Sequence, residues 1–469
     1  MKRLALFVTA LMLSACGGGG SGGGVGTSGG TDAPPSSTQP TTPVQINLGD
    51  DPADRLIAAN VTVNSVSLIS AGGGSVAVLS TPRPMEMMRL LGTVAPLAMA
   101  SVPRGSYAGA MITIGASTVT YVDAVTGVPV QRPVPGPMTT TVMFGSPLVV
   151  GTTPMVVNLD MNMAASVGID AMGIVSMSPA MTARHNAAVA GSREPEDGGL
   201  HGLNGMVGSV GSTTFTLSMM QGVSGVALTT QAGTSYEGLA GMPMMGSNHL
   251  LSVDASLQLD GSWMATRVRS RVGAGGAMAA GVVTSLTGTP PTQLVLVMHD
   301  GTGIGMMASN LASTTTVNIG DATVFSIDAR DVDLTNLPFT PRFDRATVDR
   351  GQRIEALSAG QMVQGGGMHG MMGGGTVTAT SIHLGQQGLR GTVSGYAQAG
   401  AQSTFTLTLP ADSAFARLTG STTVTVYQQG STRLRGVSGI TNGSMVQVRG
   451  LVFRDGAAVR LVAGRILGV

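Results

Sequence analysis

Cysteine, lysine, aromatic residues and charge are all scarce in this sequence. It has one cysteine, one Trp, 5 Tyr and 9 Phe among 469 residues, and 10% of its residues are charged. A single cysteine excludes an intramolecular disulfide and a zinc centre built from thiolates. Lys2 is the only lysine. Codon bias in a GC-rich genome explains the predominance of arginine more simply than a functional need.

Charge and aromatic content together argue against nucleic acid. The 25 basic and 24 acidic side chains nearly cancel, so no positive field extends over the chain. The few aromatic rings offer little surface on which bases could stack. The sequence therefore predicts that nucleic acid is not a partner.

Glycine and alternating apolar residues dominate what is present. There are 70 glycines, and residues 60–68 and 404–409 alternate apolar and polar side chains in the manner of half-buried strands. The best helix candidate spans residues 85–99, but Gly92 and Pro96 interrupt it. We therefore predict an all-β fold of short strands joined by glycine turns.

The N-terminus carries an export signal that ends in the only cysteine. Lys2 and Arg3 precede an apolar run, residues 4–13, which is too short to span a bilayer. The following Leu13-Ser14-Ala15-Cys16 resembles the lipobox of bacterial lipoproteins. The resemblance implies removal of residues 1–15 as a signal peptide and a lipid anchor on Cys16. The alternative is an ordinary signal peptide with a chance cysteine.

Residues 16–43 are predicted to be a lipidated, disordered tether. They are rich in Gly, Ser, Pro and Thr and have few apolar side chains to bury. Gly17 follows the cysteine where an Asp would favour the inner membrane, so the lipoprotein resemblance implies the outer membrane. We therefore expect a lipid-anchored protein of the cell envelope.

Residues 44–188 are expected to form a β-sandwich domain. Leu48-Gly49-Asp50-Asp51-Pro52-Ala53-Asp54 precedes a Val-Thr-Val strand, and Val102-Pro103-Arg104-Gly105-Ser106-Tyr107 precedes another strand. This order resembles an uncharacterised bacterial lipoprotein domain family with an Asp-Ala-Pro-Ala-Asp-like turn. The resemblance implies the sandwich, and it carries over no catalytic residue because the family has no assigned activity.

A charged segment, residues 189–199, is predicted to be a linker, because its residues 191–199 lack large apolar side chains. Beyond it the chain repeats itself. The repeats span residues 200–272, 278–386 and 387–469.

Each repeat contains the signals of a small barrel. A Gly-x-Val strand opens each one, at Gly205, Gly281 and Gly391, and the first and last repeats close with hairpins that turn at Asp260-Gly261 and Asp455-Gly456. Five or six strands in a unit of this size predict a closed β-barrel. The pattern is similar to an uncharacterised OB-like bacterial module that occurs in tandem in envelope proteins.

The sequence shows no motif typical of an enzyme. Its Gly-x-Ser-x-Gly pattern, at residues 19–23, lies in the tether, where no strand and helix can form a nucleophile elbow. The histidines are scattered, and none forms a His-x-x-x-His pair. They are His185, His201, His249, His299, His369 and His383.

The tightest acidic cluster is Asp328, Asp331 and Asp333. It lacks the glycine and the distant glutamate of a calcium-binding loop. We therefore interpret it as a solvated turn with Arg330 as counter-charge. The acidic residues at positions 50, 51 and 54 are interpreted in the same way.

Methionine is abundant, with 31 residues. In the middle repeat, Met368, His369, Met371 and Met372 lie between glycines where the other repeats have a tight turn, so this loop is an insertion at a hairpin tip. Thioethers and an imidazole suit Cu(I), so these four residues are candidate copper ligands, and a second Met-rich stretch lies at residues 242–249. The alternative is that methionine fills cores poor in aromatic residues, or that a surface loop has drifted in composition.

The sequence as a whole predicts a non-catalytic binding or structural module, anchored to a membrane through the lipid on Cys16. No cofactor is expected unless the methionine loop binds copper. The alternatives are a periplasmic Cu(I)-binding lipoprotein and, third, an envelope enzyme of unknown type. An envelope protein or a polysaccharide stays open as a further partner.

Overall fold

The computed structural model describes residues 39–468 except 52, 91, 220, 222–224, 242–248, 273–274, 304–309, 361, 364–374, 401 and 438. The predicted all-β fold is confirmed, since nearly every regular element is a strand. The helical elements of the described residues are η1 (Met88–Leu90), α1 (Met163–Ser166), η2 (Pro195–Asp197) and α2 (Ala414–Thr419). None of these helices is long and apolar enough to cross a membrane.

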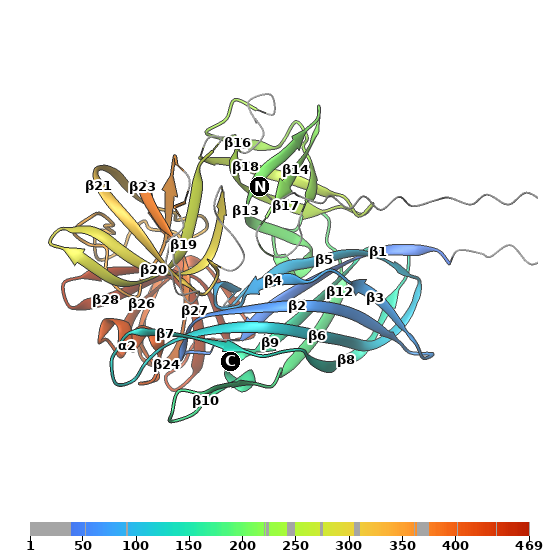
Figure 1. Cartoon of the computed structure of the whole chain (residues 1–469), viewed down its shortest axis with the longest axis horizontal. Coiled ribbons are helices and arrows are strands. Elements are labelled where there is room, and N and C mark those ends of the chain that lie inside the picture. Colours follow the sequence, from blue (N-terminus) through green and yellow to red (C-terminus); the bar gives the residue numbers. More distant parts are fainter. Residues whose placement is uncertain are drawn as a thin grey trace, which may run out of the picture. The chain divides into compact units, whose positions relative to one another are not determined.

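The first module is a β-sandwich with one hydrophobic core. One sheet has the order β12-β9-β1-β5, and the other has the path β3-β2-β6-β7 with β4 beside β2 and β8 beside β6 (Figure 1). Inward-facing residues of both sheets, such as Ile46 of β1 and Val63 of β2, share the core. A separate hairpin joins β10 and β11. The strands are β1 (Thr41–Asp51), β2 (Leu56–Ser70), β3 (Ser75–Leu79), β4 (Arg83–Glu86), β5 (Val94–Pro103), β6 (Gly105–Val122), β7 (Pro129–Val134), β8 (Met138–Val150), β9 (Met155–Asn162), β10 (Val167–Ile169), β11 (Val175–Met177) and β12 (Met181–Ala187).

Two parts of this module differ from the sequence-based expectation. β1 begins at Thr41, so the last residues of the predicted tether belong to the sheet. Residues 85–99 form no α-helix: they hold the end of β4, η1 and the start of β5. Gly92 has a left-handed φ of 69°, which breaks a helix, and Pro96 lies on an edge strand, where a missing N–H is tolerated.

The three repeats are barrels with the same strand order. In each, the first strand pairs with the second and fourth, and the third pairs in parallel with the fifth, an order consistent with the OB-like prediction. In barrel 1 the pairing of β15 with β18 closes the ring, and β16 pairs in parallel with the same edge of β18 further along. Barrel 1 has β13 (Gly199–Val210), β14 (Thr214–Ser218), β15 (Val226–Thr229), β16 (Ser235–Glu237), β17 (Leu250–Leu257) and β18 (Trp263–Val272). Barrel 2 has β19 (Ala277–Gly288), β20 (Pro291–Gly303), β21 (Thr314–Ile327), β22 (Arg353–Ser358) and β23 (Thr376–Leu384). Barrel 3 has β24 (Gln387–Ala399), β25 (Gln402–Thr408), β26 (Thr423–Arg435), β27 (Met445–Asp455) and β28 (Ala458–Gly468).

The Gly-x-Val motif has a structural reason in the barrels. A Cβ at Gly281 would overlap the carbonyl oxygen of Val297, and one at Gly391 would overlap that of Thr408. The first strand therefore approaches the second too closely for any side chain at this position.

Hydrophobic side chains also pack across the module boundaries. Leu451 and Phe453 of barrel 3 belong to the core cluster of barrel 2. A smaller cluster joins Ile57 of the sandwich, Ala312 of barrel 2 and Leu418 of α2. Within the described residues, the modules thus meet at a packed junction.

Candidate functional site

A polar cavity of about 150 Å³ lies where the modules meet. The sandwich, the segment predicted as a linker and all three barrels contribute to its wall. Its lining has more guanidinium than carboxylate groups, seven against five. The arginines are Arg89, Arg193, Arg330, Arg353, Arg433, Arg449 and Arg465, and the acids are Glu194, Asp300, Asp328, Asp331 and Glu355.

Barrel 3 supplies three of these arginines in a row across adjacent strands. Arg433 of β26 is in register with Arg465 of β28, and Arg465 is in register with Arg449 of β27. Side chains at directly opposite positions project from the same face, and like charges there repel. This arginine row (Arg433, Arg465 and Arg449) therefore requires negative charge from elsewhere in the molecule.

The segment predicted as a linker supplies part of that charge. Glu194 contacts Arg433 at 2.8 Å and Arg465 at 3.2 Å, and Glu196 contacts Arg465 at 3.0 Å. The turn η2 holds both glutamates in place, with Pro195 buried. Residues 189–199 thus include part of the cavity wall, and their acids neutralise one end of the arginine row.

Two further arginines of the wall, Arg449 and Arg353, have pKa values shifted by their surroundings. Burial, together with the charges of Arg353, Arg330 and Arg465, holds the pKa of Arg449 well below its usual range. Burial also lowers the pKa of Arg353, although the charge of Glu355 opposes the shift. No carboxylate in the described part of the chain lies within ion-pair distance of Arg353, and its buried Nε has no hydrogen-bond partner there. The cavity therefore concentrates positive charge in a buried place.

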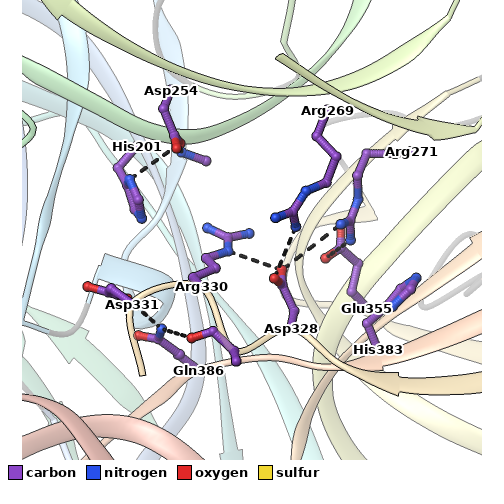
Figure 2. A network of polar contacts seen from close by, with 12 residues as sticks. His201, Asp254, Arg269, Arg271, Asp328, Arg330, Asp331, Glu355, His383 and Gln386 are labelled. Carbon is purple, nitrogen blue, oxygen red and sulfur yellow. Dashed lines mark hydrogen bonds and ion pairs between the residues drawn. The ribbon is translucent and has the colours of Figure 1, made fainter. Parts of the chain in front are cut away.

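Asp328 is the centre of a second part of the wall, where barrels 1 and 2 meet. Figure 2 shows three guanidinium groups converging on its carboxylate, with distances of 3.0 Å from Arg330, 3.1 Å from Arg269 and 4.0 Å from Arg271. Arg271 also pairs with Glu355 at 2.5 Å. Burial opposes ionisation of Asp328, but the three arginines outweigh it and hold its pKa well below the usual range.

The acidic cluster is therefore only partly as expected. Arg330 is the counter-charge of Asp328, but Asp328 is 8% exposed and not solvated. Asp331 accepts a hydrogen bond from Gln386, while Asp333 caps an exposed turn. Because arginines occupy the oxygens of Asp328, these three carboxylates do not form a calcium site. Asp50 is likewise buried, in contrast to its predicted solvation.

The described histidines do not gather at one place. His201 lies 3.3 Å from Asp254, and His383 lies between the hydroxyl groups of Ser326 and Ser381. The other described histidines are His185, His249 and His299. Within the described ranges, no three His, Cys, Asp or Glu side chains are grouped so that they could hold a metal ion.

Two predicted sites fall outside the described residues. They are the lipidation site Cys16 and the copper ligands Met368, His369, Met371 and Met372. The strands on either side of the methionine loop, β22 and β23, are an antiparallel pair, as expected for a hairpin insertion. Copper binding stays a prediction.

A buried acid–base pair joins the sandwich to barrel 2 beside this cavity. Glu86 and His299 lie 3.8 Å apart, and the two side chains are 0% and 4% exposed. Burial raises the pKa of Glu86 to about 8, although hydrogen bonds from three backbone N–H groups oppose the shift. Burial has the reverse effect on the imidazole and lowers the pKa of His299 to about 3. Gln221 of barrel 1 accepts a hydrogen bond from the backbone N–H of Glu86 and donates one to the carbonyl oxygen of His299. The sandwich, barrel 1 and barrel 2 therefore meet at this pair.

We expect Glu86 to make the protein less stable as pH rises from about 4.5 to about 8. In this window the unfolded chain releases the proton that the folded state retains, so the free energy of unfolding falls. Glu86→Gln should remove this fall in stability with rising pH, whereas Glu237→Gln, at a partly exposed position in barrel 1, should keep it. Urea unfolding at several pH values in this window measures the free energy of unfolding of the wild type and of both variants. The ionisation of His299 adds the same pH dependence to the wild type and to both variants. If the free energies of unfolding of wild type and Glu86→Gln differ by a constant amount across the window, the expectation is contradicted.

Comparisons with known proteins find one family model and several solved structures. Residues 204–269, within barrel 1, match the family model "Domain of unknown function (DUF5666)". Solved structures that match include the wild-type single-stranded DNA binding protein from Thermus aquaticus, at 13% identity and a TM-score of 0.15, covering 42% of this chain and 94% of that one. A deletion mutant of that protein matches at 14% identity and a TM-score of 0.15, covering 41% of this chain and 93% of the other. No curated protein matches the chain.

The prediction that nucleic acid is not a partner is corrected. It is contradicted by the finding that similar solved structures are single-stranded DNA binding proteins. Its physical weakness was the use of net charge, since seven of the arginines gather at one cavity although the charges of the chain nearly cancel. The exclusion is therefore withdrawn, and the low TM-score gives no ground for assigning DNA in its place.

Proposed function

We propose that this protein is a lipid-anchored, non-catalytic binding module of the cell envelope, and that its binding site is the cavity where the modules meet. The cavity carries the proposal, because more arginines than acids line it and the buried Arg353 forms no ion pair with a described carboxylate, so a negatively charged ligand is the class that this wall favours. The anchor part rests on Leu13-Ser14-Ala15-Cys16 and the glycine-rich stretch after it. The outer membrane is the proposed location, from Gly17. The barrels belong to this proposal as members of an uncharacterised envelope module.

The anchor is tested by Cys16→Ser. We expect the variant to lose labelled palmitate and to move from the membrane fraction to the soluble fraction, because only the acceptor of the lipid is removed. Ser21→Ala, five residues further along the tether, is the matched control and should keep the label. Label and membrane partition that persist in Cys16→Ser would refute the anchor and leave the cavity to be tested separately.

A further inference from the structure

A second, largely apolar pocket of about 70 Å³ lies between the sandwich, barrel 2 and barrel 3. The helix α2 and the start of β2 supply much of its wall, and most of their side chains there are buried. This apolar pocket adjoins the polar cavity, since four residues line both: Arg89, Arg353, Gln386 and Arg449. Six of its buried apolar residues are Leu56, Ile57, Leu389, Ala414, Phe415 and Leu418.

Two charges of opposite sign line the apolar pocket without forming an ion pair. Asp54 lies in the turn between β1 and β2, Arg390 lies on β24, and both residues are half-buried. Burial raises the pKa of Asp54 to about 6, although the charge of Arg390 opposes the shift, so the two groups lie close enough to interact. Neither side chain forms an ion pair or a hydrogen bond with another described residue, whereas Arg55 pairs with Asp412 at 3.7 Å.

This unpaired couple selects a ligand that carries both charges. A carboxylate accepts hydrogen bonds from an ammonium group, and a guanidinium group donates two parallel hydrogen bonds to a carboxylate. An anion alone would lie beside the negative charge of Asp54, and a cation alone beside the positive charge of Arg390. A zwitterion pairs with both residues at once, which offsets the cost of removing its charges from water.

The volume of the apolar pocket limits the rest of the ligand. A cavity of about 150 Å³ in a protein core holds benzene. At about 70 Å³ this pocket has roughly half that volume, so it admits an aliphatic group of about three or four carbons and no aromatic ring. Its buried lining of aliphatic and aromatic side chains favours such a group.

We infer that the apolar pocket binds a free α-amino acid with a short aliphatic side chain, such as valine or leucine. Its ammonium group pairs with Asp54, its carboxylate pairs with Arg390, and its side chain lies among the buried apolar residues. This site goes beyond the proposed function, because it requires no ligand in the polar cavity.

The test is titration calorimetry on the detergent-solubilised full chain. The probes are L-valine, L-leucine, L-phenylalanine, isovalerate, which is valine without its ammonium group, and isobutylamine, which is valine without its carboxylate. We expect valine and leucine to bind, and each of the other three to bind about tenfold more weakly or worse, the effect of one lost charge-assisted contact or of a ring that does not fit.

Substitutions at the two charges assign each contact. Asp54→Asn and Arg390→Gln should each weaken valine about tenfold or more. Asp54→Asn should not weaken isovalerate, and Arg390→Gln should not weaken isobutylamine, because each analogue lacks the group that the substituted residue would bind. Asp321→Asn and Arg342→Gln, at side chains 101% and 71% exposed, are the matched controls and should bind valine as the wild type does.

Folding is monitored by thermal melting of the same samples. Valine should raise the melting temperature of the wild type and of both controls, and should raise that of Asp54→Asn and Arg390→Gln much less. Ala414→Leu fills the apolar pocket and should abolish valine binding. If its larger side chain prevents folding, the two charge variants still decide the outcome.

Four results would overturn the inference. They are equal affinity of the wild type and both charge variants for valine, binding of phenylalanine as tight as that of valine, binding of isovalerate or isobutylamine as tight as that of valine, and no binding of any probe. The last of these leaves the proposed ligand of the polar cavity standing, because that ligand is tested separately.

Discussion

Asp328→Asn is expected to lower the free energy of unfolding by about 3–5 kcal/mol, the typical cost of breaking a buried ion pair on one side. The substitution leaves Arg269, Arg271 and Arg330 facing one another without the carboxylate that they share. Urea unfolding at neutral pH measures the loss. Asp333→Asn is the control, because Asp333 caps an exposed turn through a carbonyl-type oxygen that asparagine retains. Equal stability of the two variants would contradict the central place of Asp328.

The same carboxylate predicts a pH dependence. Its pKa is held below the usual value in the folded state, so its contribution is complete above the ordinary pKa of an aspartate, about 3.9. The contribution is lost as pH falls through the lower, folded pKa. We therefore expect the stability difference between wild type and Asp328→Asn to shrink below about pH 4.

The double substitution Glu194→Gln with Glu196→Gln is expected to cost about 3 kcal/mol. These acids compensate Arg465, whose side chain is 10% exposed, so their loss leaves a buried cation beside Arg449. The segment should also become more sensitive to limited proteolysis, because its contacts with barrel 3 are weakened.

A matched double variant isolates the effect of burial. Asp321→Asn with Asp455→Asn removes two exposed ion pairs, to Arg345 and Arg460, and should cost less than about 1 kcal/mol per pair. Urea unfolding compares the two double variants. Equal losses would show that the glutamates contribute no more than surface charges do.

Much of the fold could be predicted because its signals are local. The alternation in β2 and β25 sets which side chains enter a core, and the Gly-x-Val motif marks a close approach that only glycine permits. Hairpin turns at Asp260-Gly261 and Asp455-Gly456 fix the last strand pair of barrels 1 and 3. Each of these signals lies within a few residues of the structure it specifies.

The candidate site could not be predicted in the same way. Arg449 lies six residues before Asp455 and Arg465 lies nine residues after Gly456, one on each strand that this turn joins, which is the one local signal of the arginine row. A register shift between Arg449 and Gly450 decides their pairing, since a regular hairpin would place Arg449 opposite Gly464. A shift of one residue changes the face of a strand, and no simple pattern announces it.

The remaining parts of the site depend on contacts distant in sequence. Arg353 belongs to another barrel, and Glu194 approaches barrel 3 from a segment that resembles a plain linker. Codon bias remains a sound explanation for the number of arginines, but it does not address where they lie. The burial of Asp328 has the same cause, because Arg269 and Arg271, which hold its carboxylate, come from barrel 1.

The central claim is that the cavity between the modules is an anion site. Anomalous diffraction from crystals soaked in selenate, a phosphate-like dianion, tests it most directly. We expect a selenium peak in this cavity, within hydrogen-bond distance of Arg353, in the wild type, and its loss in Arg353→Gln. Selenium peaks confined to other surfaces, with the cavity empty, would contradict the claim.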